Sequence, residues 1–412
     1  MELLAPAGSL EKLTYAYTYG ADAAYMGVQT FSLRARSTNA DLYDAEALKT
    51  AKGSRRLYGA VNKFFHQKDY ELFEQSVEEL KSFPFDAFIV SDLGPARLLR
   101  KTFGDSVRLH LSTQANTLNS GAIEAYRELG FSRIILGREV SLDDIRRIRD
   151  RCPDVELETF VHGAMCMAYS GRCFLSAHLS GRSGNEGDCA HTCRWTYKPY
   201  AKMKEGYEFA LEEETRPGEY FPILEEDGYT TVMSSKDLSM IDHLRDLKEA
   251  GVDSLKIEGR MKSLYYVAVI TRAYRKALDV LEKGAPEHEA DLYRNEIATV
   301  SHREFSTGFF YSPEDIEEPT EISYVRQYLL VGTIGEKISE GLFRLHLKNR
   351  IQTGDRIEYI GPDILFIGDD QFSLIDLEGN QVEKANHHMD ICIQTSQPIE
   401  KGYIVRRSLA KT

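Results

Sequence analysis

From Met1 to about Gly284 the chain repeats one pattern, in which a short β-rich apolar segment leads through a small or polar loop into an amphipathic helical segment. Strands that alternate with helices pair in parallel, because each helix carries the chain back across the sheet. Eight such units predict an α/β domain with the (β/α)8 architecture of a TIM barrel. The candidate strands end near Leu4, Gly27, Val61, Val90, Leu111, Leu136, Val161 and Ile257.

The first and last units show where their helices begin and end. Ser9 occupies the position of an N-cap ahead of residues 10–19, and Gly20 occupies that of a C-cap glycine. In the last unit apolar side chains recur every three or four residues until Gly284. Residues 229–235 form a ninth candidate strand that the barrel does not accommodate, so a doubly wound open sheet is the alternative.

The interval between Val161 and Ile257 is several times longer than the corresponding intervals elsewhere, so it contains an insertion. We place a Cys-rich insertion at about 162–228. It follows the end of a predicted barrel strand, which is the position where barrel enzymes carry their chemistry.

The pattern changes after about residue 320. Short alternating strands follow one another, separated by Gly, Asn and Asp turns. This pattern predicts a small all-β barrel over 321–412, after a barrel-like catalytic domain over 1–320. The candidate strands lie within residues 328–336, 342–348, 354–361, 372–379, 390–396 and 402–408.

Composition restricts the classes of function. The net charge of -13 argues against a protein that grips nucleic acid over its whole surface, although a local basic patch is compatible with it. No apolar run is long enough to cross a bilayer, and the first residues lack the features of a signal peptide. We therefore expect a cytoplasmic protein without a membrane partner, in which disulfides are disfavoured.

Four of the six cysteines, Cys166, Cys173, Cys189 and Cys193, follow the spacing C-x6-C-x15-C-x3-C within the insertion. Clustered cysteines in a reducing compartment more often bind metal or perform redox chemistry than form disulfides. Four thiolates can complete a zinc site or hold an iron–sulfur cluster. The spacing lacks the C-x2-C knuckle common at zinc sites and so favours a cluster, with zinc and unliganded core thiols as alternatives.

Charged residues alternate at the end of the last predicted barrel strand. Lys256, Glu258 and Arg260 are two residues apart, so a strand would point them to the same side. Charges that share the inner face of a barrel are costly unless they are paired or bind a ligand. We assign these three as candidate catalytic residues, and a salt bridge that closes the barrel mouth is the alternative.

Other strand ends carry candidate substrate-binding residues. Paired arginines suit a carboxylate or phosphate, and side-chain amides can line a polar pocket. Beyond the cysteines, cations alternate with aromatic residues, a pattern that suits single-stranded bases. A solvated loop or charged surface turn is the alternative for each segment. The candidates are Arg34, Arg36, Asn62, Gln114, Asn116, Arg194 and Trp195.

Three segments together resemble the signatures of peptidase family U32, the collagenase-like peptidases. They are ETFVHGAMCMAYSGRCFLS at 158–176, SLKIEGRMKSLYYVA at 254–268 and HREFSTGFF at 302–310. The length and the C-terminal β domain, which looks like the second domain of translation factors, are most similar to the family members that act as prephenate-dependent tRNA wobble-uridine hydroxylases.

The resemblance implies a four-iron four-sulfur cluster on the four clustered cysteines. It also implies oxygen-independent formation of 5-hydroxyuridine at the tRNA wobble position, with prephenate as the hydroxyl donor and tRNA as the partner. The family's name suggests a peptidase instead, but the sequence has neither H-E-x-x-H nor G-x-S-x-G. Hydroxylation of ribosomal RNA or another aromatic ring is a further alternative.

Overall fold

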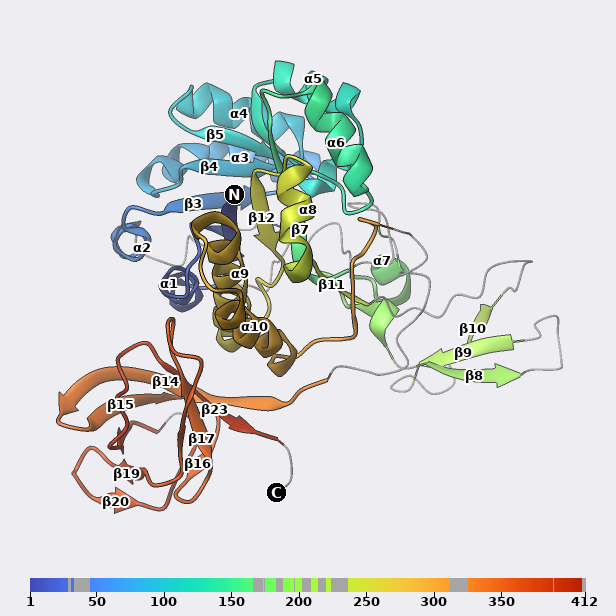
Figure 1. The fold of residues 1–412 in the computed structure, drawn as a ribbon. Helices are drawn as coiled ribbons and strands as arrows, with labels where there is room; N and C mark the ends of the chain where they lie inside the picture. The colour runs from blue at the N-terminus through green and yellow to red at the C-terminus, as the bar shows by residue number, and fades with distance from the viewer. Residues whose placement is uncertain are drawn as a thin grey trace.

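The computed structural model of the 412-residue chain has two parts, a closed α/β barrel and a C-terminal β domain (Figure 1). Within the residues described, no helix combines the length and the apolar character that crossing a bilayer requires. The structure describes residues 1–28, 31–32, 45–165, 173, 175–182, 188–195, 197–201, 209–213, 220–223, 236–311, 325–387 and 389–409.

Eight parallel strands form the barrel. Closure follows from β12, which pairs with β1 on one side and with β7 on the other. The predicted (β/α)8 fold is therefore confirmed, and the alternative of an open sheet is wrong. The candidate ninth strand at 229–235 lies outside the described residues. The barrel strands are β1 (Glu2–Pro6), β2 (Ala23–Gly27), β3 (Arg56–Val61), β4 (Ala87–Val90), β5 (Arg108–Leu111), β6 (Phe131–Ile135), β7 (Glu156–Ala164) and β12 (Ser254–Ile257).

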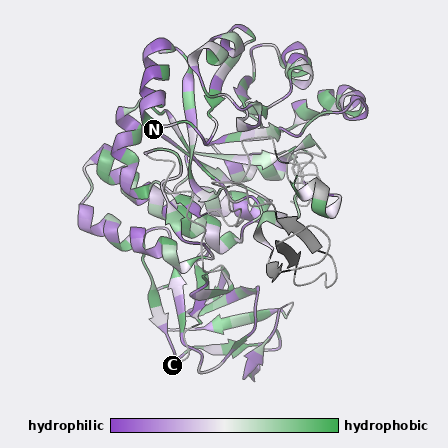
Figure 2. Cartoon of the chain, turned by 90° about the vertical axis from the view of Figure 1, so that its right-hand side faces the viewer, coloured by the Kyte–Doolittle hydropathy of each residue, from purple (hydrophilic) through white to green (hydrophobic). Residues whose placement is uncertain are grey.

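Helices surround the strands and bury their apolar sides against them (Figure 2). The predicted boundaries hold in the first unit, where the Ser9 hydroxyl accepts a hydrogen bond from the Lys12 N–H. At the end of α9, Gly284 adopts a left-handed conformation with φ of 69°, which glycine tolerates without strain. The helices are α1 (Leu10–Thr18), α2 (Ala45–Lys52), α3 (Gln67–Ser76), α4 (Leu93–Phe103), α5 (Ser120–Glu128), α6 (Leu142–Arg151), α7 (Leu175–Ser180), α8 (Leu244–Glu249), α9 (Leu264–Lys283) and α10 (Glu287–Asn295).

Strand β7 extends beyond the barrel at its C-terminal end. There it pairs in antiparallel fashion with β11 (Asp237–Ser239), which pairs in parallel with β13 (Phe305–Ser306). The register between β7 and β12 shifts at Ile257, which pairs with His162. The described part of the insertion also contains a three-stranded antiparallel sheet of β8 (Tyr197–Ala201), β9 (Phe209–Glu213) and β10 (Tyr220–Ile223).

The C-terminal domain forms an antiparallel sheet with its own apolar core. All six segments predicted from its alternating pattern contain a strand, because inward-facing apolar residues alternate with exposed ones along them. Its strands are β14 (Tyr328–Ser339), β15 (Leu342–Leu347), β16 (Ile351–Gln352), β17 (Ile357–Ile360), β18 (Ile367–Asp369), β19 (Ser373–Ile375), β20 (Gln381–Val382), β21 (Lys384–Ala385), β22 (Ile391–Gln394) and β23 (Ile404–Ser408).

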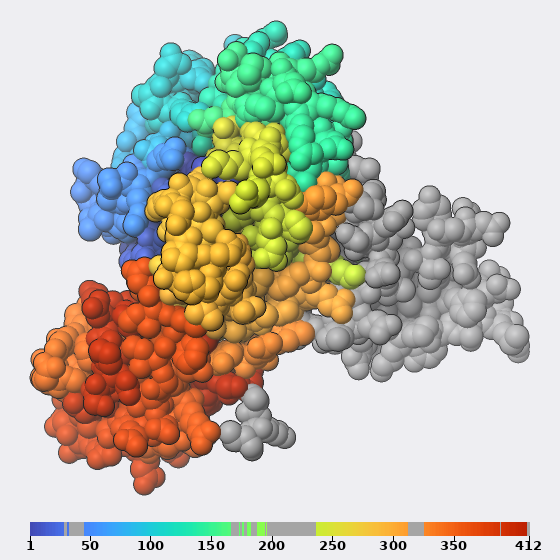
Figure 3. All heavy atoms as spheres, viewed as in Figure 1, coloured from blue at the N-terminus to red at the C-terminus, as the bar shows by residue number. Residues whose placement is uncertain are grey.

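The C-terminal domain packs against the barrel on the side of α1, α9 and α10 (Figures 1 and 3). Ile360 and Ile404 belong to the apolar core of the barrel. The Tyr19 hydroxyl on the α1 side donates to the Ile360 carbonyl at 2.9 Å, and Arg272 of α9 donates to the carbonyls of Gly361 and Ile364 at 2.6 and 2.7 Å. The two domains therefore share a buried interface.

Candidate site at the barrel mouth

Lys256 lies inside the barrel and is held by a carboxylate. Its ammonium is 2.7 Å from Glu158 of β7, and both side chains are buried. The ammonium also faces two aromatic rings, with 4.4 Å to the ring centre of Tyr25 and 5.7 Å to that of Phe160. A buried cation needs such partners. Lys256 thus forms a salt bridge with Glu158, and a salt bridge was the alternative that the sequence left open to a catalytic role.

Glu258 and Arg260 follow β12 and lie beside the same tyrosine. The Tyr25 hydroxyl donates to the Ile257 carbonyl at 2.9 Å and approaches Glu258 Oε2 at 3.5 Å. Arg260 is 4% exposed, and its guanidinium carbon is 5.7 Å from the Tyr25 ring centre. The three charged residues that the sequence grouped therefore surround one aromatic side chain.

The backbone of this segment is fixed by close contacts. A Cβ atom at Gly8 would lie 2.1 Å from the Arg260 carbonyl oxygen, so that position requires glycine. The Lys12 ammonium donates to the same carbonyl at 3.2 Å, and the Tyr266 hydroxyl of α9 donates to the Glu258 carbonyl at 3.1 Å. These contacts therefore hold the backbone of residues 258–260 in place.

Arg138 is a candidate that the sequence reasoning missed. It follows β6, and its guanidinium carbon lies 4.2 Å from the centre of the Phe160 ring, within cation–π distance. The available signal was a charged residue just beyond the predicted strand end at Leu136. Arg138, Lys256 and Arg260 thus bring three cations onto two aromatic rings at the barrel mouth.

The predicted amide residues follow two other barrel strands. Asn62 follows β3, and its side-chain nitrogen is 3.4 Å from the hydroxyl of Ser112, which follows β5. Gln114 lies in the short helix η4 (Thr113–Ala115), and its N–H donates to the same hydroxyl at 3.3 Å. Asn116 ends this helix with φ of 52°, and its buried Oδ1 has no hydrogen-bond partner within the described part of the chain. Arg34 and Arg36 lie outside the described residues.

His162 was not assigned a role from the sequence, yet it is buried at the junction of β7, β11 and α9. Its Nδ1 is 3.4 Å from the Tyr274 hydroxyl, and the ring of Phe305 lies 5.4 Å away. Burial lowers the pKa of His162 to about 3, while the nearby Asp237 carboxylate acts in the opposite direction. Asp237 in turn pairs with Arg303 at 2.9 Å. The imidazole is therefore neutral at physiological pH.

This burial predicts a pH-dependent stability. Because the folded pKa lies below the unfolded value of about 6.5, the unfolded chain binds the proton more readily, and stability falls as the pH drops from about 6.5 towards 3. Between pH 7 and pH 5 we expect the wild type to lose about 2 kcal/mol more unfolding free energy than His162→Asn. Urea unfolding of both proteins at the two pH values measures this difference, and equal losses would contradict the burial of a neutral imidazole.

The cysteine segment follows β7 and is described in part. Cys173 precedes α7. Cys189 precedes the short helix η6 (Thr192–Arg194), and Cys193 lies within it. Helix η6 packs against α7. The His191 N–H donates to the Cys189 sulfur at 3.3 Å. Cys166 lies outside the described residues.

Two further predicted residues belong to the same segment. The Trp195 indole N–H donates to the Ala190 carbonyl at 3.1 Å, and the Trp195 N–H donates to the Thr192 carbonyl. Arg194 is the last residue of η6. The structure therefore fixes the backbone between Cys189 and Trp195 as one compact turn.

The chemistry of these donors fits an iron–sulfur cluster. Cys173, Cys189 and Cys193 are partly buried cysteines, and the backbone N–H of His191 that is directed at the Cys189 sulfur is a typical way to tune such a cluster. In the part of the chain that the structure describes, no three His, Cys, Asp or Glu side chains group closely enough to hold a single metal ion.

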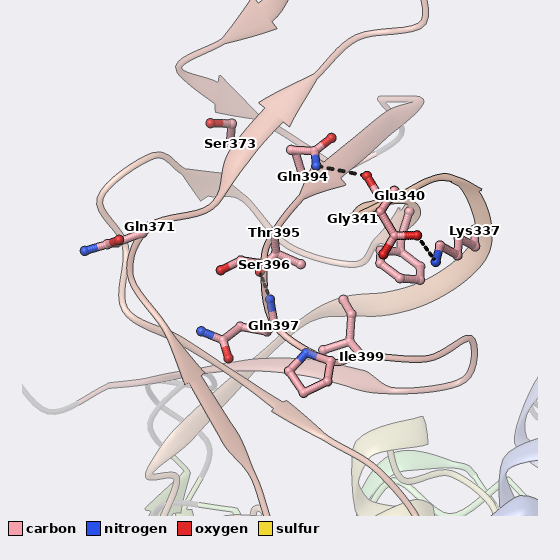
Figure 4. A pocket seen from close by; sticks show the side chains of 12 residues that line it. Lys337, Glu340, Gly341, Gln371, Ser373, Gln394, Thr395, Ser396, Gln397 and Ile399 are labelled. Carbon is pink, nitrogen blue, oxygen red and sulfur yellow. Dashed lines mark hydrogen bonds and ion pairs between the residues drawn. The ribbon is translucent and has the colours of Figure 1, made fainter.

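The C-terminal domain contains a groove of about 650 Å³ between β15, β19 and the turn after β22 (Figure 4). Its lining is mainly neutral and polar, with Gln371, Gln394 and Gln397 contributing amides, and its charged pair, Lys337 and Glu340, is joined at 2.8 Å. The groove offers hydrogen bonds to uncharged polar groups. It does not gather the cations and acids found at the barrel mouth.

Comparison with known proteins finds family matches over both domains of the chain. Residues 8–319 match peptidase family U32, and residues 326–406 match the peptidase family U32 C-terminal domain. The tRNA hydroxylation protein P of Escherichia coli is 35% identical over 93% of this chain and 90% of that protein. The 23S rRNA 5-hydroxycytidine C2501 synthase of E. coli is 33% identical over 73% of this chain and 42% of that protein.

A third relative carries a different name. A collagenase of Porphyromonas gingivalis is 31% identical over 88% of this chain and 86% of that protein. The similarity therefore spans proteins named for RNA modification and for proteolysis. With both of its domains matched and the barrel and β domain in place, the chain belongs to peptidase family U32.

Proposed function

We propose that this chain is a tRNA-modifying enzyme that hydroxylates the wobble uridine to 5-hydroxyuridine without molecular oxygen, with prephenate as hydroxyl donor and an iron–sulfur cluster. The main observation behind this proposal is that three cations, Arg138, Lys256 and Arg260, lie against the rings of Tyr25 and Phe160 at the barrel mouth. Near full-length similarity to a tRNA hydroxylation protein supports the choice of tRNA over ribosomal RNA, because the rRNA-modifying relative is matched over less than half of its length.

The barrel mouth suits a cyclic dicarboxylate such as prephenate. Arg260 and Arg138 can each bind a carboxylate through paired N–H donors, and Lys256 adds a third cation. Tyr25 and Phe160 offer ring faces or edges to an unsaturated ring. The side-chain amides of Asn62 and Gln114 can hydrogen-bond the edge of a uracil brought to the same mouth.

Transfer of a hydroxyl group from the donor to C5 of uracil breaks the donor C–O bond and the uracil C5–H bond. It balances when the donor carbon takes up the C5 proton and the electron pair, so that the donor ends with a C–H bond in place of its C–OH bond. Glu258, whose Oε2 lies 3.5 Å from the Tyr25 hydroxyl, is our candidate acceptor for the C5 proton. The four-iron four-sulfur cluster, which Cys166, Cys173, Cys189 and Cys193 would hold, supplies electron-transfer chemistry when bound. The rest of the mouth would hold both substrates in place and exclude water.

A peptidase is the second candidate, which the collagenase relative favours. The absence of a three-residue metal group from the described residues gives a metallopeptidase no support.

Both functions can be tested together. Nucleosides of tRNA from a strain that lacks the gene should lose 5-hydroxyuridine and its derivatives, and the gene should restore them. Unchanged nucleosides, or gelatin cleavage that survives purification to homogeneity, would contradict the proposal.

A further inference from the structure

The interior of this barrel is crossed by a network of buried charges. It joins Glu2 of β1, Arg133 of β6, Glu158 of β7 and the pair Ser254 and Lys256 of β12, all of them buried. Barrel interiors are usually filled with branched apolar side chains, because a buried charge costs several kcal/mol unless it is paired. A charge network in that place therefore calls for an explanation beyond packing.

Glu158 is the centre of this network. Its Oε1 accepts from the Lys256 ammonium at 2.7 Å, while its Oε2 accepts from Arg133 at 3.0 Å and lies 3.1 Å from the Ser254 hydroxyl. Arg133 also pairs with Glu2 at 2.5 Å. Contacts from two neighbouring elements hold the carboxylate, so it has one orientation, with one oxygen directed at Lys256.

Lys256 is left with unused hydrogen-bonding capacity. An ammonium has three N–H donors. Within the described residues its hydrogen-bond acceptor is Glu158, and the ring faces of Tyr25 and Phe160 flank it. A buried ammonium that donates one hydrogen bond can bind a further anionic group.

We propose that Glu158 is a positioning residue that keeps Lys256 protonated and directed at the barrel mouth, where the ammonium anchors a carboxylate of the small-molecule substrate. The second half of this statement rests on the proposed function. Lys256 then acts as a fixed cation rather than as a proton-transfer group, which changes the role that the sequence suggested for it.

The electrostatics agree with this role. Burial lowers the pKa of Lys256, and the cations of Arg133 and Arg260 lower it further, whereas the Glu158 carboxylate raises it. His110 and Tyr25 also face the ammonium; burial holds the pKa of His110 well below its usual range, so it adds no charge at neutral pH. Glu158 is thus the group that opposes deprotonation of Lys256.

The experiment compares the wild type with Glu158→Gln. The pKa of Lys256 is read from its ¹³Cε chemical shift in lysine-labelled protein, with Lys256→Arg to assign the signal. In Glu158→Gln we expect the titration midpoint to fall by about 1 to 3 pH units. Prephenate binding, measured by calorimetry at pH 8, should weaken by tenfold or more.

Glu156→Gln is the matched control, because Glu156 also pairs with Arg133, at 2.7 Å, without contacting Lys256. It should leave both the midpoint and the prephenate affinity near the wild-type values. Glu158→Asp keeps the charge and serves if Glu158→Gln fails to fold; its midpoint should move less. An unshifted midpoint in Glu158→Gln, or a shifted one with unchanged prephenate affinity, would overturn the proposal. A wild type that binds no prephenate would refute the proposed donor and anchoring role, while the titration would still decide whether Glu158 controls the charge of Lys256.

Discussion

Replacing Cys189 with serine should remove the bound iron and sulfide and reduce 5-hydroxyuridine formation by at least about a hundredfold. The Cys189 sulfur accepts a hydrogen bond from the His191 N–H, and it lies in the compact turn that continues through η6 to Trp195. A serine hydroxyl is a much poorer ligand for iron than a thiolate, so the cluster would lose one of its four attachments. Iron and sulfide analysis of anaerobically purified protein, together with nucleoside mass spectrometry, measures both effects.

Cys392 provides the matched control. It lies on β22, buried in the C-terminal domain and far from the insertion in the fold. Cys392→Ser should keep the full iron content and the full hydroxylation activity. Normal activity in Cys189→Ser, or iron loss of equal size in Cys392→Ser, would contradict the assignment of the cluster to the four clustered cysteines.

Replacing Arg406 with methionine should destabilise the chain by about 3–5 kcal/mol, because it breaks a buried ion pair and leaves Glu296 with the longer contact to Arg272, at 3.6 Å. Arg406 is 1% exposed and joins β23 of the C-terminal domain to the barrel. Its guanidinium bonds both oxygens of Glu296 at 2.5 and 3.1 Å, Glu358 at 2.7 Å and the Tyr265 hydroxyl at 2.9 Å.

Urea unfolding followed by circular dichroism measures the loss of unfolding free energy. Arg344→Met is the control, because Arg344 is more exposed and its carboxylate partner, Asp390, lies 3.6 Å away near the surface. That variant should change the free energy by less than about 1 kcal/mol. An effect of Arg406→Met no larger than that of the control would show that the interface does not depend on this buried network.

Most of the fold was predictable because its signals are local. Short apolar segments lead into helices with recognisable ends, as Ser9 at the start of α1 and Gly284 at the end of α9 illustrate. Closure of the barrel was not local, since it depends on β12 pairing with both β1 and β7, strands that are distant in sequence. The sequence alone was therefore also compatible with an open sheet. The strand order in the structure excludes that alternative, because β12 pairs with both β1 and β7.

The site was predictable where its residues share one strand end. Lys256, Glu258 and Arg260 were grouped by their two-residue spacing, and the structure places them around Tyr25. Glu158 was missed as the partner of Lys256 because the two are joined only when β7 and β12 pair. His162 gave no signal, since its burial depends on β11 and α9, which are far from it in sequence.

The most direct test of the central claim is hydroxylation by the purified chain itself. Protein prepared and reconstituted with iron and sulfide under anaerobic conditions is incubated with prephenate and tRNA that lacks the modification. Mass spectrometry of the digested nucleosides should detect 5-hydroxyuridine only when protein, prephenate and tRNA are all present. Protein with a full iron and sulfide content that forms no 5-hydroxyuridine under these conditions would contradict the account.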